Sequence, residues 1–204
     1  MLQANDLACS RGNRELFRNK SFRVEPGSLL RITGANGAGK TSLLRMVAGL
    51  SPVESGRIEW RGRSLQELGD EYRGDLAFVG HANALKAGLT AYENLRLALA
   101  VQGVRVTDAE VRGALEEEGL GRIADVAIQR LSAGQQRRVA LVRIGLARSR
   151  RLWILDEPFS SLDDAAVTRF SGRLSAFARD GGVAVYTTHQ DVPIDAPTGV
   201  LALA

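Results

Sequence analysis

The sequence predicts an α/β fold, in which a layered sheet core carries an inserted helical subdomain. Three observations predict it. A glycine-rich loop stands between an apolar run and a helical pattern, near-continuous apolar runs follow late in the chain, and three helix-capping signals lie between these two parts. Near-continuous apolar runs are typical of parallel strands that are covered on both faces. The length of 204 residues fits one domain of this class.

The first part of the chain is predicted to consist of short strands and one helix. Residues 1–33 contain turn signals at Gly12-Asn13 and Pro26-Gly27 and end in the apolar run 29–33. Further short strands are expected at residues 58–60 and 76–79. Between them, apolar residues recur at helical spacing, at Leu43, Leu44, Val47 and Leu50.

A mostly helical subdomain is expected over residues 81–145. It contains three pairs with capping-box spacing, Thr90 with Glu93, Thr107 with Glu110, and Ser132 with Gln135. Strands at 152–155 and 183–187, with a helix from 164 to 179 between them, complete the core. The core is therefore expected to consist of residues 1–80 and 146–204, and the whole chain to be a single domain.

Composition limits the classes of protein to which the chain can belong. Hydrophobic residues make up 45% and charged residues 25%, as in ordinary globular domains. No apolar run approaches the roughly 20 residues of a membrane-spanning helix, and residues 1–20 lack the apolar centre of a signal peptide. The single cysteine, Cys9, excludes an internal disulfide, and no Cys/His cluster has metal-ligand spacing.

The net charge of +4 is spread along the chain, as on an ordinary solvated surface. A basic excess would also suit an anionic membrane face or nucleic acid. Aromatic residues make up only 5% of the chain, which argues against a stacking platform for single-stranded nucleic acid. No direct nucleic-acid partner is therefore expected.

The glycine-rich loop has the complete G-x-x-x-x-G-K-T pattern, Gly34-Ala35-Asn36-Gly37-Ala38-Gly39-Lys40-Thr41, and is followed by Ser42. Glycines at this spacing let the backbone turn tightly and direct successive N–H groups at an anion. Lys40 can reach the outer phosphates of a nucleotide, and the Thr41 hydroxyl can ligate Mg²⁺. The alternative is an ordinary glycine-rich turn, but the strand and helix expected on either side favour nucleotide binding.

An acidic pair, Asp156 and Glu157, follows the apolar run 152–155. A strand that ends in this way places carboxylates at the edge of the sheet where α/β proteins bind ligands. Asp156 would ligate a phosphate-bound Mg²⁺ directly or through water, and Glu157 would act as the base that orients the attacking water. On its own the pair would also suit a turn before a helix, but together with the glycine-rich loop it favours catalysis.

A second anion site is predicted at Leu131-Ser132-Ala133-Gly134-Gln135. Ser132 and the N–H groups of the helix that begins here can face a phosphate. A chain with one nucleotide loop has little use for two phosphate sites, unless two copies of the chain share them. The alternative interpretation is an ordinary helix cap.

In their order along the chain, the motifs resemble those of the ATP-binding subunits of ABC transporters. Residues 34–41 resemble the Walker A motif, 131–135 the signature motif, 152–157 the Walker B motif, 160–163 the D-loop, and His189 the H-switch. The resemblance implies a P-loop NTPase of the ABC ATPase type, with a mixed sheet core and an antiparallel β subdomain.

The same resemblance implies a chemistry and a dimer. ATP would bind with Mg²⁺, Glu157 would be the catalytic base, and His189 would sense the γ-phosphate. Two copies would bind two ATP molecules head to tail, with Asp163 crossing the interface. Ser132, Gly134 and Gln135 of one copy would then close the nucleotide site of the other.

Two positions depart from the usual pattern of this family. Arg11 stands where an aromatic side chain commonly stacks on adenine, and a guanidinium plane can also stack on a base. His81 stands at the position of the Q-loop glutamine, in the loop before Thr90. It could order a water near Mg²⁺, touch a partner, or be an ordinary surface histidine.

The sequences around residues 80–81, 131–141, 153–159 and 187–190 resemble more closely the cytochrome c biogenesis ATP-binding export subunits, the CcmA family. This resemblance implies an ATP hydrolase that energises haem export or delivery as a peripheral protein on the cytoplasmic face of the bacterial inner membrane. The implied partners are integral membrane subunits, CcmB with CcmC and CcmD. The alternatives are another small ABC exporter, a soluble ABC ATPase that acts on nucleic acid or ribosomes, and a small-molecule kinase.

Overall fold

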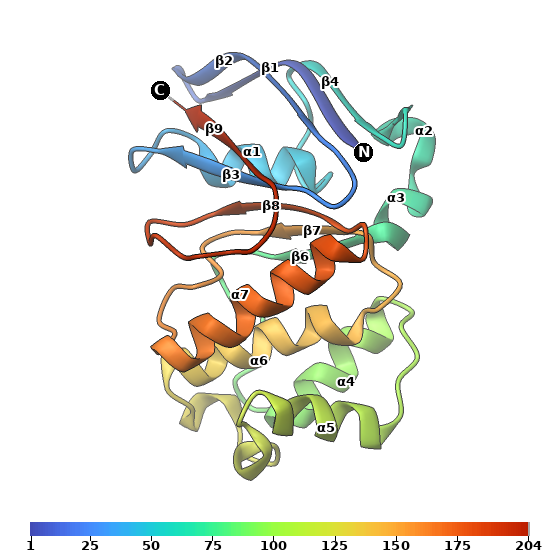
Figure 1. Ribbon diagram of the computed structural model, residues 1–204, viewed down its shortest axis with the longest axis vertical. Helices are drawn as coiled ribbons and strands as arrows, with labels where there is room; N and C mark the ends of the chain where they lie inside the picture. The colour runs from blue at the N-terminus through green and yellow to red at the C-terminus, as the bar shows by residue number, and fades with distance from the viewer. Residues whose placement is uncertain (204) are drawn as a thin grey trace.

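The structure is a computed structural model that describes residues 1–203 as two sheets with helices packed against them (Figure 1). The parallel sheet has the order β6-β7-β8-β3-β9, made of Leu76–Val79, Leu152–Leu155, Val183–Thr187, Leu29–Gly34 and Thr198–Leu203. The antiparallel sheet has the order β2-β1-β4-β5, made of Arg14–Val24, Leu2–Arg11, Ser55–Trp60 and Arg63–Ser64. The α/β fold with an antiparallel part is thus confirmed, and the two kinds of strand lie in separate sheets.

The helices are arranged in layers along the long axis of the molecule. Helix α1 (Lys40–Val47) lies between the two sheets, and α7 (Asp164–Arg179) covers the other face of the parallel sheet (Figure 1). Helix α6 (Ala133–Leu146) runs beside α7, with α4 (Ala91–Val101) and α5 (Asp108–Glu117) beyond it. The remaining helices are short: α2 (Leu65–Leu68), α3 (Asp70–Asp75), η1 (Gly121–Ile123) and η2 (Ile128–Arg130).

Three apolar clusters hold these layers together. Strand β7 is apolar at every position because it is covered on both faces of the sheet. Leu152 and Ile154 belong to the cluster around α1, whereas Trp153 and Leu155 belong to the cluster around α7. Since successive side chains of a strand point to opposite faces, a strand covered on both faces needs no polar positions. The third cluster joins α4, α5 and α6.

Most elements predicted from local pattern are present. All three capping boxes form at Thr90, Thr107 and Ser132, and α7 spans the predicted 164–179. Two predictions are wrong. Strands β1 and β2 have 10 and 11 residues instead of being short. Leu50 is not part of α1 but is 51% exposed beyond it, because the chain leaves the helix at Gly49, where φ is 67°.

Other elements were missed, one of them although it has a local signal, because Ser64 and Glu67 form a capping box at the start of α2. Strand β9 and helices α2 and α3 were not predicted, and β9 is placed by its parallel pairing with β3 at the sheet edge. The predicted helical subdomain, 81–145, contains α4, α5 and all of α6 except Leu146, and its boundaries stay a prediction. Within residues 1–203 we find no helix with both the length and the apolar character needed to span a membrane.

Candidate nucleotide site

The glycine-rich loop joins β3 to α1 at the carboxyl end of the parallel sheet. Gly34, Gly37 and Gly39 have φ angles of 145°, 80° and 99°, which glycine adopts without a steric penalty. No side chain caps the first turn of α1. Lys40 Nζ donates to the carbonyl oxygens of Gly34 (2.7 Å) and Ala35 (3.2 Å), so the cation lies over the loop. Backbone N–H groups, a helix N-terminus and a cation together suit a phosphate.

Asp156 connects this loop to the neighbouring strands. Its side chain is buried, with Oδ2 accepting from the Thr41 hydroxyl and Oδ1 accepting from the Thr187 hydroxyl, both at 2.8 Å. The Thr41 and Asp156 oxygens are hard donors, which fit Mg²⁺. Within residues 1–203 no group of three or more His, Cys, Asp or Glu could hold a metal ion. A metal at this site would therefore need oxygens from a phosphate and from water as well.

Glu157 has a backbone conformation that is unusual for a residue with a side chain. Its φ is 51°, in the left-handed region. This conformation costs on the order of 1–3 kcal/mol and persists only where contacts with the surroundings offset that cost. Its N–H donates to Thr187 Oγ1 at 2.8 Å, and its Oε2 accepts from the N–H of His189 at 3.3 Å. Oε1 lies 3.4 Å from His189 Nε2 and accepts no hydrogen bond from the described residues. Oε1 is therefore a buried oxygen with unused capacity to accept a hydrogen bond.

Many of the predicted site residues line one cavity of about 490 Å³. Its wall contains ten of them, together with Ser160: Arg11, Asn36, Gly37, Gly39, Lys40, Thr41, His81, Asp156, Glu157 and His189. Gly34, Ala35, Ala38 and Ser42 belong to the same loop and helix start but do not line the cavity. The structure thus brings the two atypical positions, Arg11 and His81, to the same cavity as the glycine-rich loop.

The second predicted anion site lies outside this cavity. Ser132 caps α6, its Oγ accepting from the N–H of Gln135 at 3.2 Å, while Gln135 Oε1 accepts from the N–H of Ser132 at 2.9 Å. Asp163 caps α7 by accepting from the N–H of Ala166 at 2.7 Å. Within one chain, Ser132, Gly134, Gln135 and Asp163 do not line the cavity around Lys40. Their predicted role at a nucleotide therefore requires a second copy.

Gly134 makes a close backbone contact that gives a testable prediction. A Cβ atom on Gly134 would lie 2.5 Å from the carbonyl oxygen of Ser161, which is backbone and cannot easily move aside. We expect Gly134→Ala to push the start of α6 away from residues 160–163 and to lower the melting temperature by several degrees. Thermal unfolding followed by circular dichroism would measure this. Ala133→Gly is the matched control, and an equal loss in both variants would contradict the prediction.

Arg137 and Thr187 contribute to the site but were not predicted as site residues. Arg137 is 4% exposed, and burial lowers its pKa to about 10, although Asp156 and Glu157 oppose the shift. The sequence contained a signal for the burial of Arg137, because it lies four positions before the apolar residue Leu141 and therefore on the same face of the helix. Both residues are buried in the structure. Thr187 is a polar residue at the end of an apolar strand, where sheet ligands bind.

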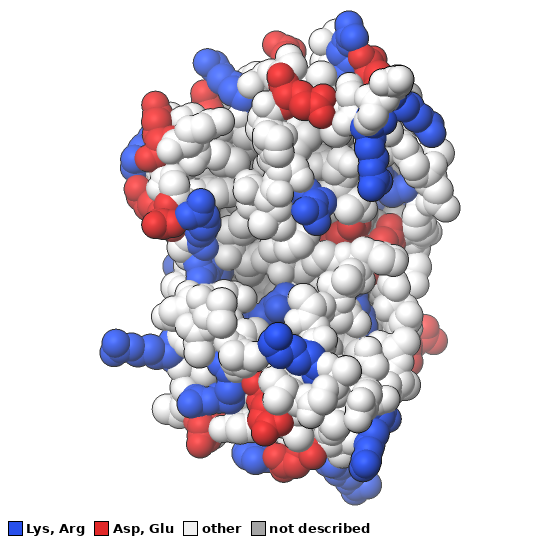
Figure 2. Space-filling view, turned by 180° about the vertical axis from the view of Figure 1, so that it is seen from behind, with Lys and Arg blue, Asp and Glu red and all other residues white. Residues whose placement is uncertain are grey.

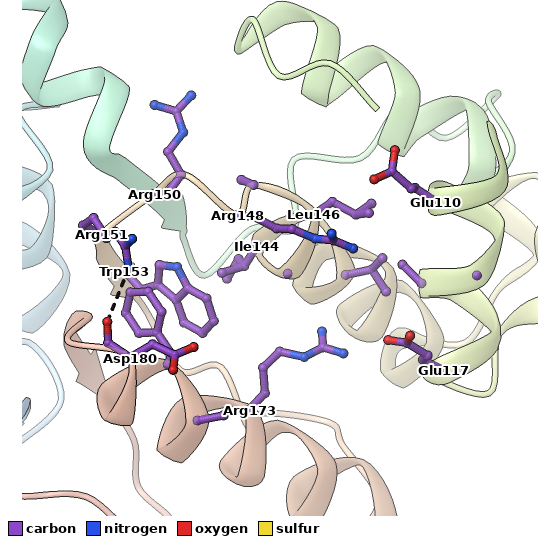
Figure 3. Close-up of a pocket in the computed structure, with 17 residues that line it drawn as sticks. Glu110, Glu117, Ile144, Leu146, Arg148, Arg150, Arg151, Trp153, Arg173 and Asp180 are labelled. Atoms are coloured by element: carbon purple, nitrogen blue, oxygen red, sulfur yellow. Dashed lines mark hydrogen bonds between the residues drawn. The ribbon is translucent and has the colours of Figure 1, made fainter. Parts of the chain in front are cut away.

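A second cavity, of about 540 Å³, lies between α5, α6 and α7 and contains no predicted site residue (Figure 3). Trp153 stacks on Phe177 at its base, with ring centroids 3.8 Å apart. Glu110 and Glu117 extend from α5, and Arg173 extends from α7 on the opposite side (Figure 3). This lining is mixed in charge and lacks a glycine-rich loop, so the nucleotide site is assigned to the cavity around Lys40.

Comparison with known proteins shows the family to which the chain belongs. The family model described as "ABC transporter" matches residues 17–160. A cytochrome c biogenesis ATP-binding export protein CcmA from Dechloromonas aromatica is 49% identical over 97% of this chain and 97% of its own length. The protein of that name from Aromatoleum aromaticum is 47% identical over 100% of this chain and 95% of its own.

Solved structures give the same result for the fold. A structure titled as the ATP binding subunit of an ABC transporter is 28% identical and has a TM-score of 0.80, covering 92% of this chain and 79% of its own. A putative ABC transporter ATP-binding protein from Pyrococcus furiosus is 21% identical, with a TM-score of 0.83, covering 99% of this chain and 96% of its own, and shows the fold alone. The chain therefore belongs to the ABC transporter ATP-binding subunits, and within them to the CcmA family.

Proposed function

We propose that the chain binds and hydrolyses ATP as the motor subunit of a membrane complex that supports haem export or delivery for c-type cytochrome biogenesis. The observation that carries the ATPase part is the convergence of Lys40, Asp156, Glu157 and His189 on one cavity. The cytochrome c part is supported by relatives that match nearly the whole chain and are named cytochrome c biogenesis ATP-binding export proteins. ATP is the substrate, and Mg²⁺ is the proposed cofactor.

The residues of the cavity have different roles in ATP binding and hydrolysis. Lys40 and the loop N–H groups bind the β- and γ-phosphates, and Arg11 stacks on the adenine. Thr41 and Asp156, partly through water, would hold Mg²⁺, which when bound neutralises charge on the phosphate oxygens. His81 either orders a water near these oxygens or contacts a partner.

Glu157 is the proposed base. It takes a proton from the water that attacks the γ-phosphorus, and the bond from that phosphorus to the bridging oxygen of ADP breaks. Oε1 is buried but accepts no hydrogen bond from the described residues, so it keeps the capacity to take a proton once a water reaches it. His189 is held beside Glu157 through its own N–H and is exposed enough, at 58% of its side chain, to contact the γ-phosphate.

Two copies of the chain would complete the site. Ser132, Gly134 and Gln135 sit at the N-terminus of α6, outside the cavity of their own chain. Backbone N–H groups at a helix N-terminus attract an anion. In a head-to-tail homodimer this helix start closes on the γ-phosphate held by the other copy, and Asp163 lies at the interface.

Membrane subunits would dock on the surface formed by residues 81–100 and the end of α4. Leu97 and Val101, one helical turn apart, are 39% and 80% exposed, an apolar stripe that a partner could cover. By resemblance the partners are CcmB, with CcmC and CcmD, and the chain sits on the cytoplasmic face of the inner membrane. Nucleic acid is less suited, because the face in Figure 2 intersperses Lys and Arg with Asp and Glu.

Complementation tests the cytochrome c part of the proposal. In a host whose own CcmA gene is deleted, this chain is expected to restore covalently bound haem in c-type cytochromes, measured by haem staining after denaturing electrophoresis. Lys40→Ala is expected to fail, while b-type cytochromes stay unchanged. A chain that restores no c-type haem yet co-purifies with ribosomes or nucleic acid would support the alternative ATPase function.

Cross-linking tests the docking surface. A photo-reactive residue at position 86, where Lys86 is exposed, should capture an integral membrane protein in intact cells. The same probe at position 18, where Arg18 lies on the distant antiparallel sheet, is the control. Equal capture from both positions would contradict a docking surface at residues 81–100.

A further inference from the structure

Arg137 joins two segments of the chain that lie on different sides of its guanidinium. Nη1 donates to the carbonyl oxygen of Gly80 and to Asn83 Oδ1, both at 2.9 Å. Nη2 donates to the carbonyl oxygens of Asp156 (2.6 Å) and Glu157 (2.8 Å). One buried side chain thus holds the loop before α4 and the acidic pair after β7.

The guanidinium of Arg137 couples the position of the loop 80–83 to that of the acidic pair, because it is planar and rigid. Its donors have fixed directions, so a shift of one pair of acceptors rotates or displaces the other pair of donors. Its acceptors are three carbonyl oxygens and one amide oxygen, and the side chain is only 4% exposed. A buried charge is costly unless its hydrogen bonds are made, so the loop and the acidic pair are not free to move independently.

Glu157 is the residue that this link affects most. Its backbone is in the left-handed region, with φ of 51°, and three hydrogen bonds hold its peptide groups there. Its N–H donates to Thr187, and its carbonyl oxygen accepts from Arg137 at 2.8 Å and from the N–H of Ser160 at 3.1 Å. Loss of the shorter, charged bond from Arg137 would leave the carbonyl oxygen held by Ser160 alone, and the peptide could then relax and turn the carboxylate away from His189.

We propose that Arg137 is a positioning residue through which the loop 80–83 controls the carboxylate of Glu157. The inference rests on the proposed role of Glu157 as the base. Arg137 does not line the cavity around Lys40 and would therefore act through Glu157. Because the loop contains His81 and begins the proposed docking surface, a membrane partner that moves the loop changes the geometry of the base at a distance.

Steady-state kinetics of the purified chain test the link to Glu157. Arg137→Gln is expected to lower kcat for ATP at least tenfold and to change KM by less than twofold. Arg138→Gln is the matched control, because Arg138 is the next residue of α6 and donates to the carbonyl oxygen of Glu118 instead. All rates are measured well below the melting temperature of each variant. If Arg137→Gln does not fold, Arg137→Lys is the substitute, because it keeps the positive charge but lacks the planar guanidinium. It is expected to give the same loss of kcat with little change in KM.

A double substitution separates positioning from general destabilisation. In the Glu157→Gln background, Arg137→Gln should change kcat by less than twofold, because its effect passes through a base that is already gone. A further tenfold loss would overturn the proposal. So would a normal kcat in Arg137→Gln when Glu157→Gln is inactive. If Glu157→Gln itself turns over normally, the proposed function of Glu157 fails first, which distinguishes the two results.

The loop side is tested by Asn83→Ala, which removes one acceptor without touching the acidic pair. We expect a two- to fivefold loss of kcat with KM unchanged, and no further loss when Arg137 is already glutamine. Independent, multiplicative effects of the two substitutions would show that the loop and Glu157 are not linked through Arg137.

Discussion

Lys40→Ala is expected to abolish measurable ATP turnover and to weaken nucleotide binding at least about tenfold. Lys40 is the cation over the glycine-rich loop, 2.7 Å from the Gly34 carbonyl oxygen. A hydrogen bond between charged groups contributes about 1.5–3 kcal/mol, and each 1.4 kcal/mol is a factor of ten in the dissociation constant. Titration calorimetry with a slowly hydrolysed ATP analogue would measure the binding, and phosphate release would measure turnover.

The control for Lys40→Ala is Lys86→Ala in the isolated chain. Lys86 is exposed and does not line the cavity, so both binding and turnover should stay within twofold of the original protein. If Lys40→Ala binds the analogue as tightly as the unchanged chain and still releases phosphate, the cavity around the glycine-rich loop is not the nucleotide site.

Glu157→Gln is expected to keep ATP binding and to lose about 10²–10⁴-fold of kcat, the contribution of a positioned general base. Glutamine has nearly the same shape, and Glu157 uses only its backbone in the hydrogen bonds to Thr187 Oγ1, to which its N–H donates, and with Arg137, from which its carbonyl oxygen accepts. The fold and the left-handed conformation should therefore survive the change. Single-turnover phosphate release, compared with analogue binding, would separate the chemical step from affinity.

The same variant tests the dimer. Since ATP binds but is not cleaved, Glu157→Gln with ATP and the membrane partners should sediment as a species with two copies of the chain. Ser132→Arg in addition should return it to one copy, because a long cation would block the start of α6. A species with one copy in every condition would contradict a site shared between two chains, while leaving the ATP-binding prediction intact.

Local pattern was sufficient for much of the fold. The capping boxes at Thr90, Thr107 and Ser132 were predictable because each joins residues only three positions apart. Strand β9, with Thr198 and Gly199 at its start, was not, because it forms the edge of the sheet only by pairing with β3, which is more than 160 residues away in the sequence. Leu50 fits the helical spacing but lies outside α1, because the spacing of apolar residues does not indicate where a glycine ends a helix.

The sequence by itself determined which chemistry is available: a phosphate loop, an acidic pair after a strand, a helix start with Ser132, and their order along the chain. Only the tertiary structure decided which of them meet. It brings Thr41 to Asp156 across 115 residues at 2.8 Å, leaves Ser132 outside that cavity, and places Arg137 between two distant segments. The physical reason is that turns and caps are set by neighbours in sequence. Contacts between distant residues depend on how the sheet and helices pack, and no local pattern records that packing.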